Sequence, residues 1–258
     1  MTTIFDSKRT LVPCLDVRNG RTLAASGITG LNDPWNPLEI ATLYGNLSST
    51  ALLFLDIFDK HDKASEFLPL VRSIATAIKA PMNVMVERGT ISSLDDIQLY
   101  LEAGAQTFIL NNSAVERPAV VSEAVKRYGS DRIIGGIAAK PASPGHWEHC
   151  IGVERTGTGL DAVEWARRLA DLGVSALVVT SVKQEGKGQG YELELTKAVS
   201  EAVNIPIIAS GGMGKVEHMG EILSKGGAKG VLVNANFFNG QIPLAEADAY
   251  LSQYQEAS

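Results

Sequence analysis

Eight short apolar runs, helical segments between them and an internal repeat of half the chain together predict an α/β fold, a single (β/α)8 or TIM barrel. The chain has 258 residues, a length that suits one barrel of about 250 residues as well as two smaller domains. Hydrophobic residues make up 45% of it and charged residues 20%, so it can bury a large core. This composition excludes disorder of the chain as a whole.

The apolar runs have the length and the Val, Ile, Leu and Phe content of strands that are buried on both faces. They are 11–17, 51–57, 82–86, 107–111, 133–138, 175–180, 205–210 and 230–234. Helical spacing of apolar residues lies between most of them, as in 95–103 and 162–172. Because no linker rich in Pro, Gly and Ser interrupts this alternation, one closed barrel over 1–258 is favoured over two open parallel sheets.

Three strand segments of the first half recur in the second half at an offset of about 123 residues. The matched pairs are 11–17 with 133–139, 51–56 with 176–181, and 104–111 with 227–234. An offset that is nearly constant over three strands predicts two (β/α)4 halves, approximately 1–130 and 131–258. We expect a pseudo-twofold axis along the barrel to relate them.

Charge and cysteine usage restrict the function classes. The formal net charge of −6 opposes binding to nucleic acid or to an anionic membrane surface, so only a local basic pocket is expected to bind an anion. Cys14 and Cys150 are too few for a disulfide framework. The chain shows neither a signal peptide nor 18 consecutive apolar residues, which predicts a cytoplasmic protein that does not span a membrane.

Metal and cofactor binding is not expected from the histidines. His61, His146 and His149 show no metal-ligand spacing with cysteines or carboxylates, and we expect them in solvated loops.

In a (β/α)8 barrel the active site lies at the C-terminal ends of the strands, so the residues that end each apolar run are the candidates. Asp16 is the strongest of them, because a carboxylate that closes an otherwise apolar strand is costly to bury unless it is paired or catalytic. The alternative is a structural hydrogen bond at the strand end. Asp56 ends the next strand in the same way.

Two glycine-containing loops are candidate ligand sites. Ser210, Gly211 and Gly212 follow the seventh strand and precede a helical segment, where backbone N–H groups can bind a phosphate; the alternative is an ordinary tight turn. The repeat-related loop carries Arg88 and Gly89, so a second phosphate there would depend mainly on the guanidinium. The segment 183–190 is either a mobile loop that covers a ligand or a solvated connector.

Several motifs together resemble a known family. They are Pro-Cys-Leu-Asp-Val at 13–17, Asn-Asn-Ser-Ala-Val-Glu-Arg-Pro at 111–118, Thr-Ser at 180–181 before Gly186, and Ile-Ile-Ala-Ser-Gly-Gly-Met-Gly-Lys-Val-Glu-His at 207–218. In this order, over nearly the whole chain, they resemble the cyclase subunit of imidazole glycerol phosphate synthase. The first and last of them distinguish that cyclase from its sister, the phosphoribosyl-formimino isomerase of the same pathway.

The resemblance implies a half-barrel repeat and a barrel that takes ammonia from a glutaminase subunit docked at its N-terminal face. It implies cleavage of a bis-phosphorylated ribulosyl-formimino carboxamide into imidazole glycerol phosphate and an aminoimidazole carboxamide ribotide, with no cofactor. Two aspartates at the ends of strands one and five perform the acid/base steps in that family. Asp16 matches the first, whereas Ala138 stands in the place of the second, and a methyl group transfers no proton.

Other positions also depart from that family. Arg88-Gly89-Thr90 replaces a triple-glycine phosphate loop, Lys183 and Glu185 replace paired acids, and Ala24 stands where the first loop carries a lysine. At the opposite face the family has a gate of four charged residues. Of its positions only Arg9 is charged here, and Ala51, Thr107 and Ala176 occupy the others.

The resulting hypothesis is a cyclase-like subunit that binds a phosphorylated ribosyl-type metabolite and has an altered lyase or cyclase activity. Asp16 is the expected acid/base with Asp56 beside it, and Lys183 or Glu185 is the replacement proton shuttle. The expected ligand-binding residues are Arg88, Gly89, Asn111, Ser181, Gly186, Ser210, Gly211, Gly212 and Asn234. The alternatives are a diverged ammonia-dependent enzyme of sugar or specialised-metabolite synthesis, and a non-catalytic subunit that binds a ligand or forms a complex.

Overall fold

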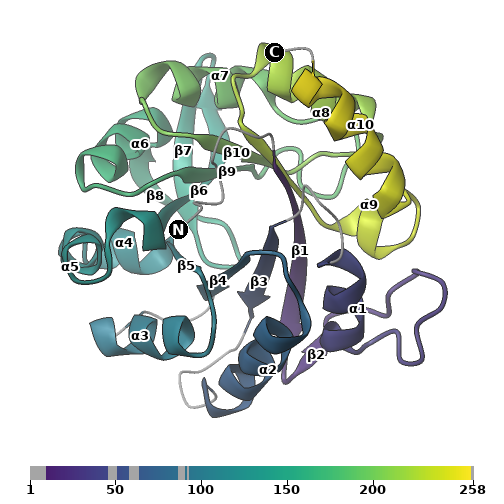
Figure 1. The fold of residues 1–258 in the computed structure, drawn as a ribbon. Helices are drawn as coiled ribbons and strands as arrows, with labels where there is room; N and C mark the ends of the chain where they lie inside the picture. The colour runs from purple at the N-terminus through teal and green to yellow at the C-terminus, as the bar shows by residue number, and fades with distance from the viewer. Residues whose placement is uncertain (1–9, 46–50, 58–63, 87–90, 92, 257–258) are drawn as a thin grey trace.

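The computed structural model describes residues 10–45, 51–57, 64–86, 91 and 93–256. Eight parallel strands close into a barrel in this part of the chain (Figure 1). They are β1 (Thr10–Arg18), β3 (Leu52–Asp56), β4 (Met82–Val86), β5 (Thr107–Leu110), β6 (Ile133–Ser143), β9 (Leu177–Ser181), β10 (Ile207–Ser210) and β11 (Gly230–Val233). Strand β1 pairs with both β3 and β11, and β5 pairs with β6, which closes the ring and confirms the predicted barrel.

Helices surround the barrel on its outer side (Figure 1). They are α1 (Pro37–Tyr44), α2 (Ala64–Ala77), α3 (Leu94–Glu102), α4 (Asn112–Glu116), α5 (Ala119–Tyr128), α6 (Ala162–Asp171), α7 (Leu193–Ala202), α8 (Glu217–Lys225), α9 (Ala235–Phe238) and α10 (Leu244–Glu256). Helix α6 begins where the Asp161 side chain accepts hydrogen bonds from the first turn of backbone N–H groups. Among the described residues, no helix has the length and apolar composition needed to cross a membrane.

The strand registers agree with the internal repeat. Asp16 of β1 pairs with Leu55 of β3, and Ala138 of β6 pairs with Thr180 of β9. These are equivalent positions of the two halves in the sequence alignment above. The two half-barrels therefore present corresponding residues at the same height, with Asp16 and Ala138 in equivalent places.

The strand side chains alternate between two layers, because successive residues of a strand point to opposite faces. Leu53 packs inside the barrel, whereas Leu52 and Phe54 pack against the helices, and all three are buried. The barrel interior also contains Ala51 and Ala176, so these two positions of the family's gate are apolar in this chain. Thr107, at a third gate position, is buried and donates a hydrogen bond to Asn83; Arg9 lies outside the described residues.

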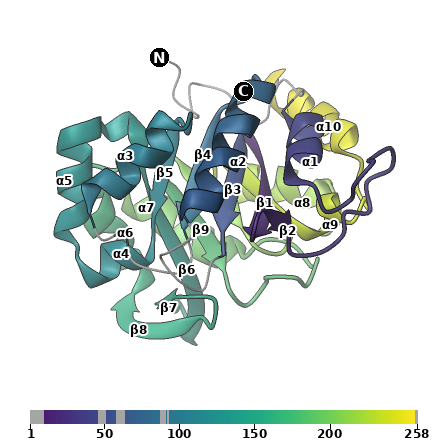
Figure 2. The same ribbon diagram turned by 90° about the horizontal axis from the view of Figure 1, so that it is seen from below.

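After β6 the chain forms a β-hairpin, which the sequence analysis did not predict. Strands β7 (His146–Ile151) and β8 (Thr156–Asp161) pair antiparallel with the end of β6 and project beyond the barrel (Figure 2). The expectation of a solvated loop is wrong for His149, which is fully buried on β7. Burial lowers the pKa of its imidazole to about 4, so the ring is neutral near pH 7. His146 is exposed, and His61 lies outside the described residues.

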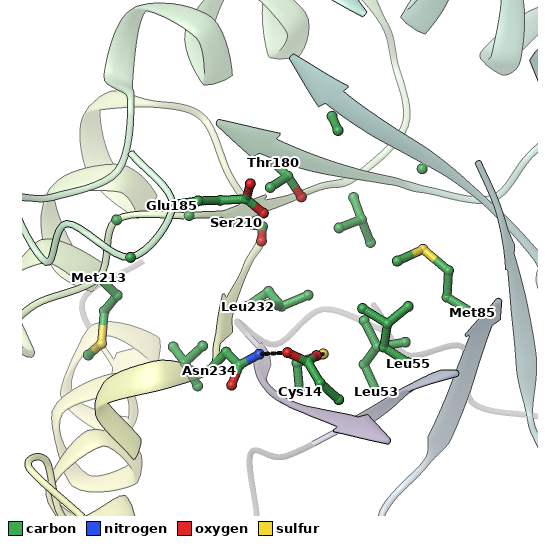
Figure 3. A pocket seen from close by; sticks show the side chains of 18 of the residues that line it. Cys14, Leu53, Leu55, Met85, Thr180, Glu185, Ser210, Met213, Leu232 and Asn234 are labelled. Atoms are coloured by element: carbon green, nitrogen blue, oxygen red, sulfur yellow. Dashed lines mark hydrogen bonds between the residues drawn. The ribbon is translucent and has the colours of Figure 1, made fainter. Parts of the chain in front are cut away.

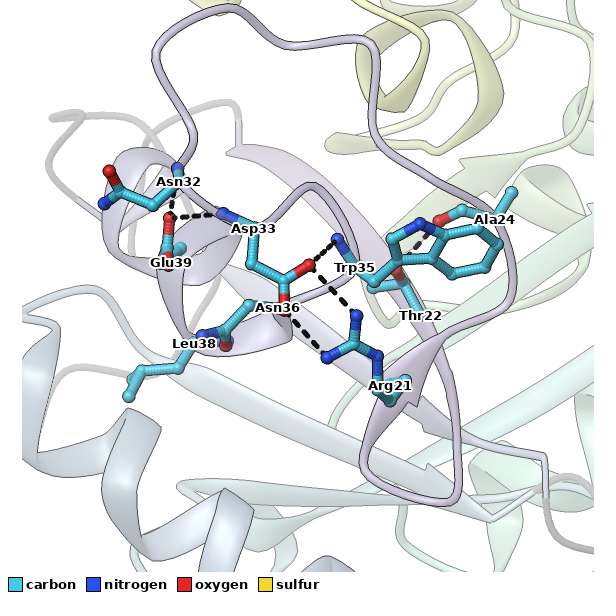
Figure 4. Close-up of polar contacts among 9 residues, drawn as sticks. All are labelled: Arg21, Thr22, Ala24, Asn32, Asp33, Trp35, Asn36, Leu38 and Glu39. Atoms are coloured by element: carbon cyan, nitrogen blue, oxygen red, sulfur yellow. Dashed lines mark hydrogen bonds and ion pairs between the residues drawn. The ribbon is translucent and has the colours of Figure 1, made fainter.

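The segment between β1 and α1 is held by carboxylates (Figure 4). Strand β2 (Arg21–Thr22) pairs with the end of β1, and the Arg21 guanidinium donates two hydrogen bonds to Asp33, at 2.7 and 3.0 Å. The hydrogen bonds from Arg21 hold the pKa of the Asp33 carboxyl below its usual value. The Glu39 carboxylate of α1 accepts a hydrogen bond from the Asn32 backbone N–H, at 2.8 Å. These contacts hold the first βα segment against the N-terminus of α1.

Candidate active site

A cavity of about 320 Å³ opens at the C-terminal ends of the barrel strands, within the size range of small-molecule sites. Residues of all eight barrel strands, or of the positions directly after them, line it, together with the loops after β7, β9 and β10. Its lining includes Asp16, Asn111, Glu185, Gly186, Ser210, Gly211, Gly212 and Asn234 from the sequence-predicted site. The structure therefore brings most of the predicted residues into one pocket.

The lining divides into a polar and an apolar arc. Asp16, Asn234, Ser210 and Thr180 line it along β1, β11, β10 and β9, which are consecutive in the barrel. Figure 3 shows Asn234, Ser210, Thr180 and Glu185 gathered on one side. We call this set the polar arc. In small-molecule sites a few polar groups of this kind fix the orientation of the ligand.

Apolar side chains line the pocket along β3 and β4. Leu55 of β3 and Met85 of β4 lie opposite the polar arc (Figure 3). They occupy the places that Thr180 and Ser210 hold in the other half, since Leu55 pairs with Met85 and Thr180 pairs with Ser210. With Leu53 they form what we call the apolar arc. The repeat of the fold is thus accompanied by a difference in chemistry.

Asp16 lies near the C-terminal end of β1 and points into this pocket. Its carboxylate accepts hydrogen bonds from Asn234 Nδ2 at 2.9 Å and from Cys14 Sγ at 3.5 Å. Burial raises the pKa of the Asp16 carboxyl above its usual value, and the hydrogen bonds from Asn234 and Cys14 partly oppose that shift. A carboxyl with a raised pKa in a cleft can both hold and release a proton, as general acid/base catalysis requires.

The glycine-containing loops after β9 and β10 lie against each other. The Gly190 N–H donates to the Gly212 carbonyl at 2.7 Å, and Gly211 and Gly212 have positive φ angles of 86° and 112°. A Cβ at Gly212 would lie 2.1 Å from the Gly190 carbonyl oxygen, so this approach requires glycine. The segment 183–190 is therefore packed against the β10 loop, with Gly186 and Gly188 lining the pocket.

We expect Gly212→Ala to separate these two loops. The strained φ angle and the contact with Gly190 together should lower the free energy of unfolding by roughly 2–4 kcal/mol. Gly186→Ala is the matched control, because Gly186 also has a positive φ but nothing lies within 4 Å of its Cβ position. Urea denaturation should show a smaller loss for that control, about 1 kcal/mol. Equal losses for both variants would contradict the close packing of the loops.

Arg155 is a pocket residue that the sequence analysis missed. It ends the turn between β7 and β8, and its guanidinium binds both oxygens of Glu185, with Nη2–Oε1 at 2.6 Å and Nε–Oε2 at 3.1 Å. Arg155 was missed because the hairpin was missed. Pro144-Gly145 and Gly152, on either side of a segment containing Trp147, were the turn signals that predict it.

Asp56 does not lie beside Asp16, so its prediction as a catalytic neighbour is wrong. Leu55 lines the pocket, and the alternation of side chains along β3 turns Asp56 outward, where it is buried against α3. There it forms a hydrogen bond with the Tyr100 hydroxyl. Burial and the nearby Asp56 carboxylate raise the pKa of Tyr100.

The same alternation moves Ser181 out of the pocket. Thr180 lines it, whereas Ser181 is buried and donates a hydrogen bond to Glu192. Trp147 of the hairpin also donates to Glu192, from Nε1 at 2.9 Å. Glu192 thus joins the hairpin to the end of β9, and the Ser181 side chain faces Glu192 instead of the pocket. Lys183 is exposed and is absent from the pocket lining, so the structure favours Glu185 of the two predicted shuttles.

Three remaining positions complete the comparison with the predicted site. Arg88 and Gly89 lie outside the described residues. Asn111 lines the pocket, and among the described residues its buried Oδ1 has no hydrogen-bond partner, which suits an acceptor for a ligand. In the described part of the chain no group of three or more His, Cys, Asp or Glu residues is placed to hold a metal ion.

Comparison with known proteins agrees with this geometry. The family described as histidine biosynthesis protein matches residues 10–243. The chain belongs to that family. It is 37% identical over 243 residues to the imidazole glycerol phosphate synthase subunit HisF of Prochlorococcus marinus (strain NATL1A), which covers 93% of this chain and 94% of the relative. Every residue of the pocket lies inside the region matched by the histidine biosynthesis family.

Proposed function

We propose that this chain is a cyclase-type subunit of the imidazole glycerol phosphate synthase kind, which binds a phosphorylated ribosyl-type metabolite and performs lyase or cyclase chemistry with ammonia. The observation that carries the proposal is the position of Asp16. A half-buried carboxyl with a raised pKa faces a small-molecule cavity that the glycine turns after β9 and β10 also line, in a member of the histidine biosynthesis family. The pathway is histidine biosynthesis or a related one.

In this proposal the polar arc performs the chemistry. The backbone N–H groups around Gly211 and Gly212 bind the phosphate, because glycine leaves these groups accessible to an anion. Asp16 gives and takes the proton at its carboxylate, and the hydrogen bond from Asn234 fixes the carboxylate orientation. Glu185 supplies the second acid/base group in place of the carboxylate that Ala138 lacks.

Ammonia would come from a glutaminase subunit at the N-terminal face of the barrel. The name of the Prochlorococcus relative describes that protein as a subunit of a synthase. In this chain Ala51 and Ala176 make the corresponding end of the barrel interior apolar, so a neutral molecule would meet no charged side chain at these two positions.

Thermal unfolding in the presence of phosphorylated metabolites tests the binding step. A ligand at 100 times its dissociation constant should stabilise the fold by about 2.7 kcal/mol. We expect sugar phosphates with a ribosyl or ribulosyl group to stabilise the wild-type chain and to have little effect on Gly212→Ala. Stabilisation by the unphosphorylated sugars to the same extent would overturn the phosphate site.

The apolar arc favours the second candidate, a diverged ammonia-dependent enzyme of sugar or specialised-metabolite synthesis. Leu55 and Met85 stand where the repeat-related Thr180 and Ser210 offer hydroxyl groups. Such an enzyme would accept a ligand with one phosphate and a less polar second end. Tighter binding of a monophosphate than of the bis-phosphorylated carboxamide would select this candidate.

A further inference from the structure

Arg155 is the one cationic side chain among the described residues that line the pocket. The hairpin turn fixes its position: its backbone N–H donates to the Gly152 carbonyl at 3.1 Å, and its φ angle is +52°. This left-handed conformation ends the turn, and the side chain of Arg155 reaches Glu185 in the loop after the neighbouring strand β9. A cation is thus placed by the backbone at a site where the sequence had predicted only backbone N–H groups.

The ion pair of Arg155 and Glu185 is partly buried. The two side chains are 25% and 35% exposed, and both carboxylate oxygens accept hydrogen bonds from the guanidinium. The Glu185 side chain also lies against the β10 turn, because its Cγ is 3.5 Å from the Cβ position of Gly211. A carboxylate therefore lies next to the glycine turn that we propose binds phosphate. It opposes an anion there unless its charge is balanced.

A phosphate that enters this turn competes with Glu185 for the same guanidinium. The planar fork of arginine binds the oxygens of either group through two parallel hydrogen bonds, and a phosphate carries the larger negative charge. We infer that, when the ligand binds, Arg155 exchanges its ion pair with Glu185 for one with the ligand's phosphate. This exchange frees the Glu185 carboxylate. The inference rests on the proposed phosphate site.

The exchange requires only side-chain movement. Glu192 separately connects the hairpin to the β9–α7 loop, since it accepts hydrogen bonds from both Trp147 and Ser181. The freed Glu185 remains in the pocket with Asp16, whose pKa its charge already raises. Ligand binding would thereby supply the second carboxylate that Ala138 does not provide.

Calorimetric titration with inorganic phosphate, at constant ionic strength, tests the inference through two effects of opposite sign. Arg155→Gln should weaken phosphate binding roughly tenfold to a hundredfold, since hydrogen bonds between charged groups are lost. Glu185→Gln should tighten it roughly threefold to tenfold, because the competing carboxylate is gone. In the Arg155→Gln background the same Glu185→Gln change should tighten binding by less than about twofold.

The ion pair of Glu164 and Arg167 on α6 provides the matched control. It lies outside this pocket with both side chains exposed, so Glu164→Gln should leave phosphate affinity unchanged. If the Arg155–Glu185 pair only fastens the hairpin to the loop, Arg155→Gln and Glu185→Gln will both weaken binding, which would overturn the exchange. Equal tightening by Glu185→Gln with and without Arg155 would also overturn it. Failure of wild type and Glu185→Gln alike to bind phosphate would remove the phosphate site itself.

Discussion

Asp16→Asn is expected to lower the turnover number by a factor on the order of 10²–10⁴, the usual contribution of a positioned proton donor or acceptor. The same variant should unfold at higher urea concentration than wild type near pH 7. This follows because the fold raises the pKa of the Asp16 carboxyl, mainly through burial, so ionisation of that group costs stability. If Asp16 is catalytic, Asp16→Asn should therefore lose activity and gain stability.

The pH dependence of unfolding follows from the direction of that shift. The cost of the ionised carboxyl is absent below the unfolded-state pKa, near 3.8, and grows as the pH rises toward the higher pKa of the folded state. The stability advantage of Asp16→Asn should therefore shrink as the pH is lowered. A variant that is less stable than wild type at pH 7 would instead indicate that Asp16 makes a structural hydrogen bond at the strand end.

Asp56→Asn is the control for this experiment. Asp56, like Asp16, is a carboxyl near a strand end, but it is fully buried and faces Tyr100 and α3 instead of the pocket. We expect Asp56→Asn to change the free energy of unfolding and to leave the turnover number near the wild-type value. Equal losses of turnover in Asp16→Asn and Asp56→Asn would contradict the assignment of roles.

Ala138→Asp is expected to raise turnover, by a factor up to the order of 10²–10⁴. Its methyl group lines the pocket at the position equivalent to Asp16, so a carboxylate there faces the same cavity from the other half of the barrel. The gain requires that the phosphate site still holds the substrate in place. Steady-state assays with saturating free ammonia measure it.

Two further variants, Ala138→Asn and Glu185→Gln, distinguish the effect of a proton-transferring group from the effect of a larger side chain. Ala138→Asn adds a side chain of similar size without a titrating group, and it should give no gain. Glu185→Gln should lower turnover strongly in the wild-type chain and less in the Ala138→Asp background, because the two carboxylates then serve one role. Additive effects of Glu185→Gln and Ala138→Asp would show that Glu185 is not the replacement group.

The barrel could be predicted from sequence because buried parallel strands appear in it as continuous apolar runs. The internal repeat aligns Asp16 with Ala138, and the strand registers place these two residues at equivalent positions. The direction in which the residues at the strand ends point was harder to predict. Asp56 and Ser181 end apolar runs just as Asp16 does, and only the alternation of the strand decides which of two neighbours faces the pocket.

Arg155 was missed for a different reason. The segment that carries it is rich in glycine and polar residues, and its burial against α6 and β6 is a tertiary effect. His149 illustrates this, since its ring stacks on Trp165 of α6 at a centroid distance of 6.0 Å and its Nδ1 lies 3.1 Å from the Ala138 carbonyl oxygen. Histidine is intermediate between the buried and the exposed residue types, so only the polar sequence around His149 favoured a solvated loop.

Turnover of the bis-phosphorylated ribulosyl-formimino carboxamide by the wild-type chain, with free ammonia in excess, is the most direct test of the proposed function. The Prochlorococcus relative, assayed alongside, gives the reference rate. We expect the imidazole product to form more slowly than at that reference rate, because Glu185 replaces the missing carboxylate of β6 only in part. In Asp16→Asn the rate should fall by a further factor on the order of 10²–10⁴. Binding of this substrate with no product at all, or product formed at the same rate without Asp16, would contradict the assignment of a cyclase-type activity to this pocket.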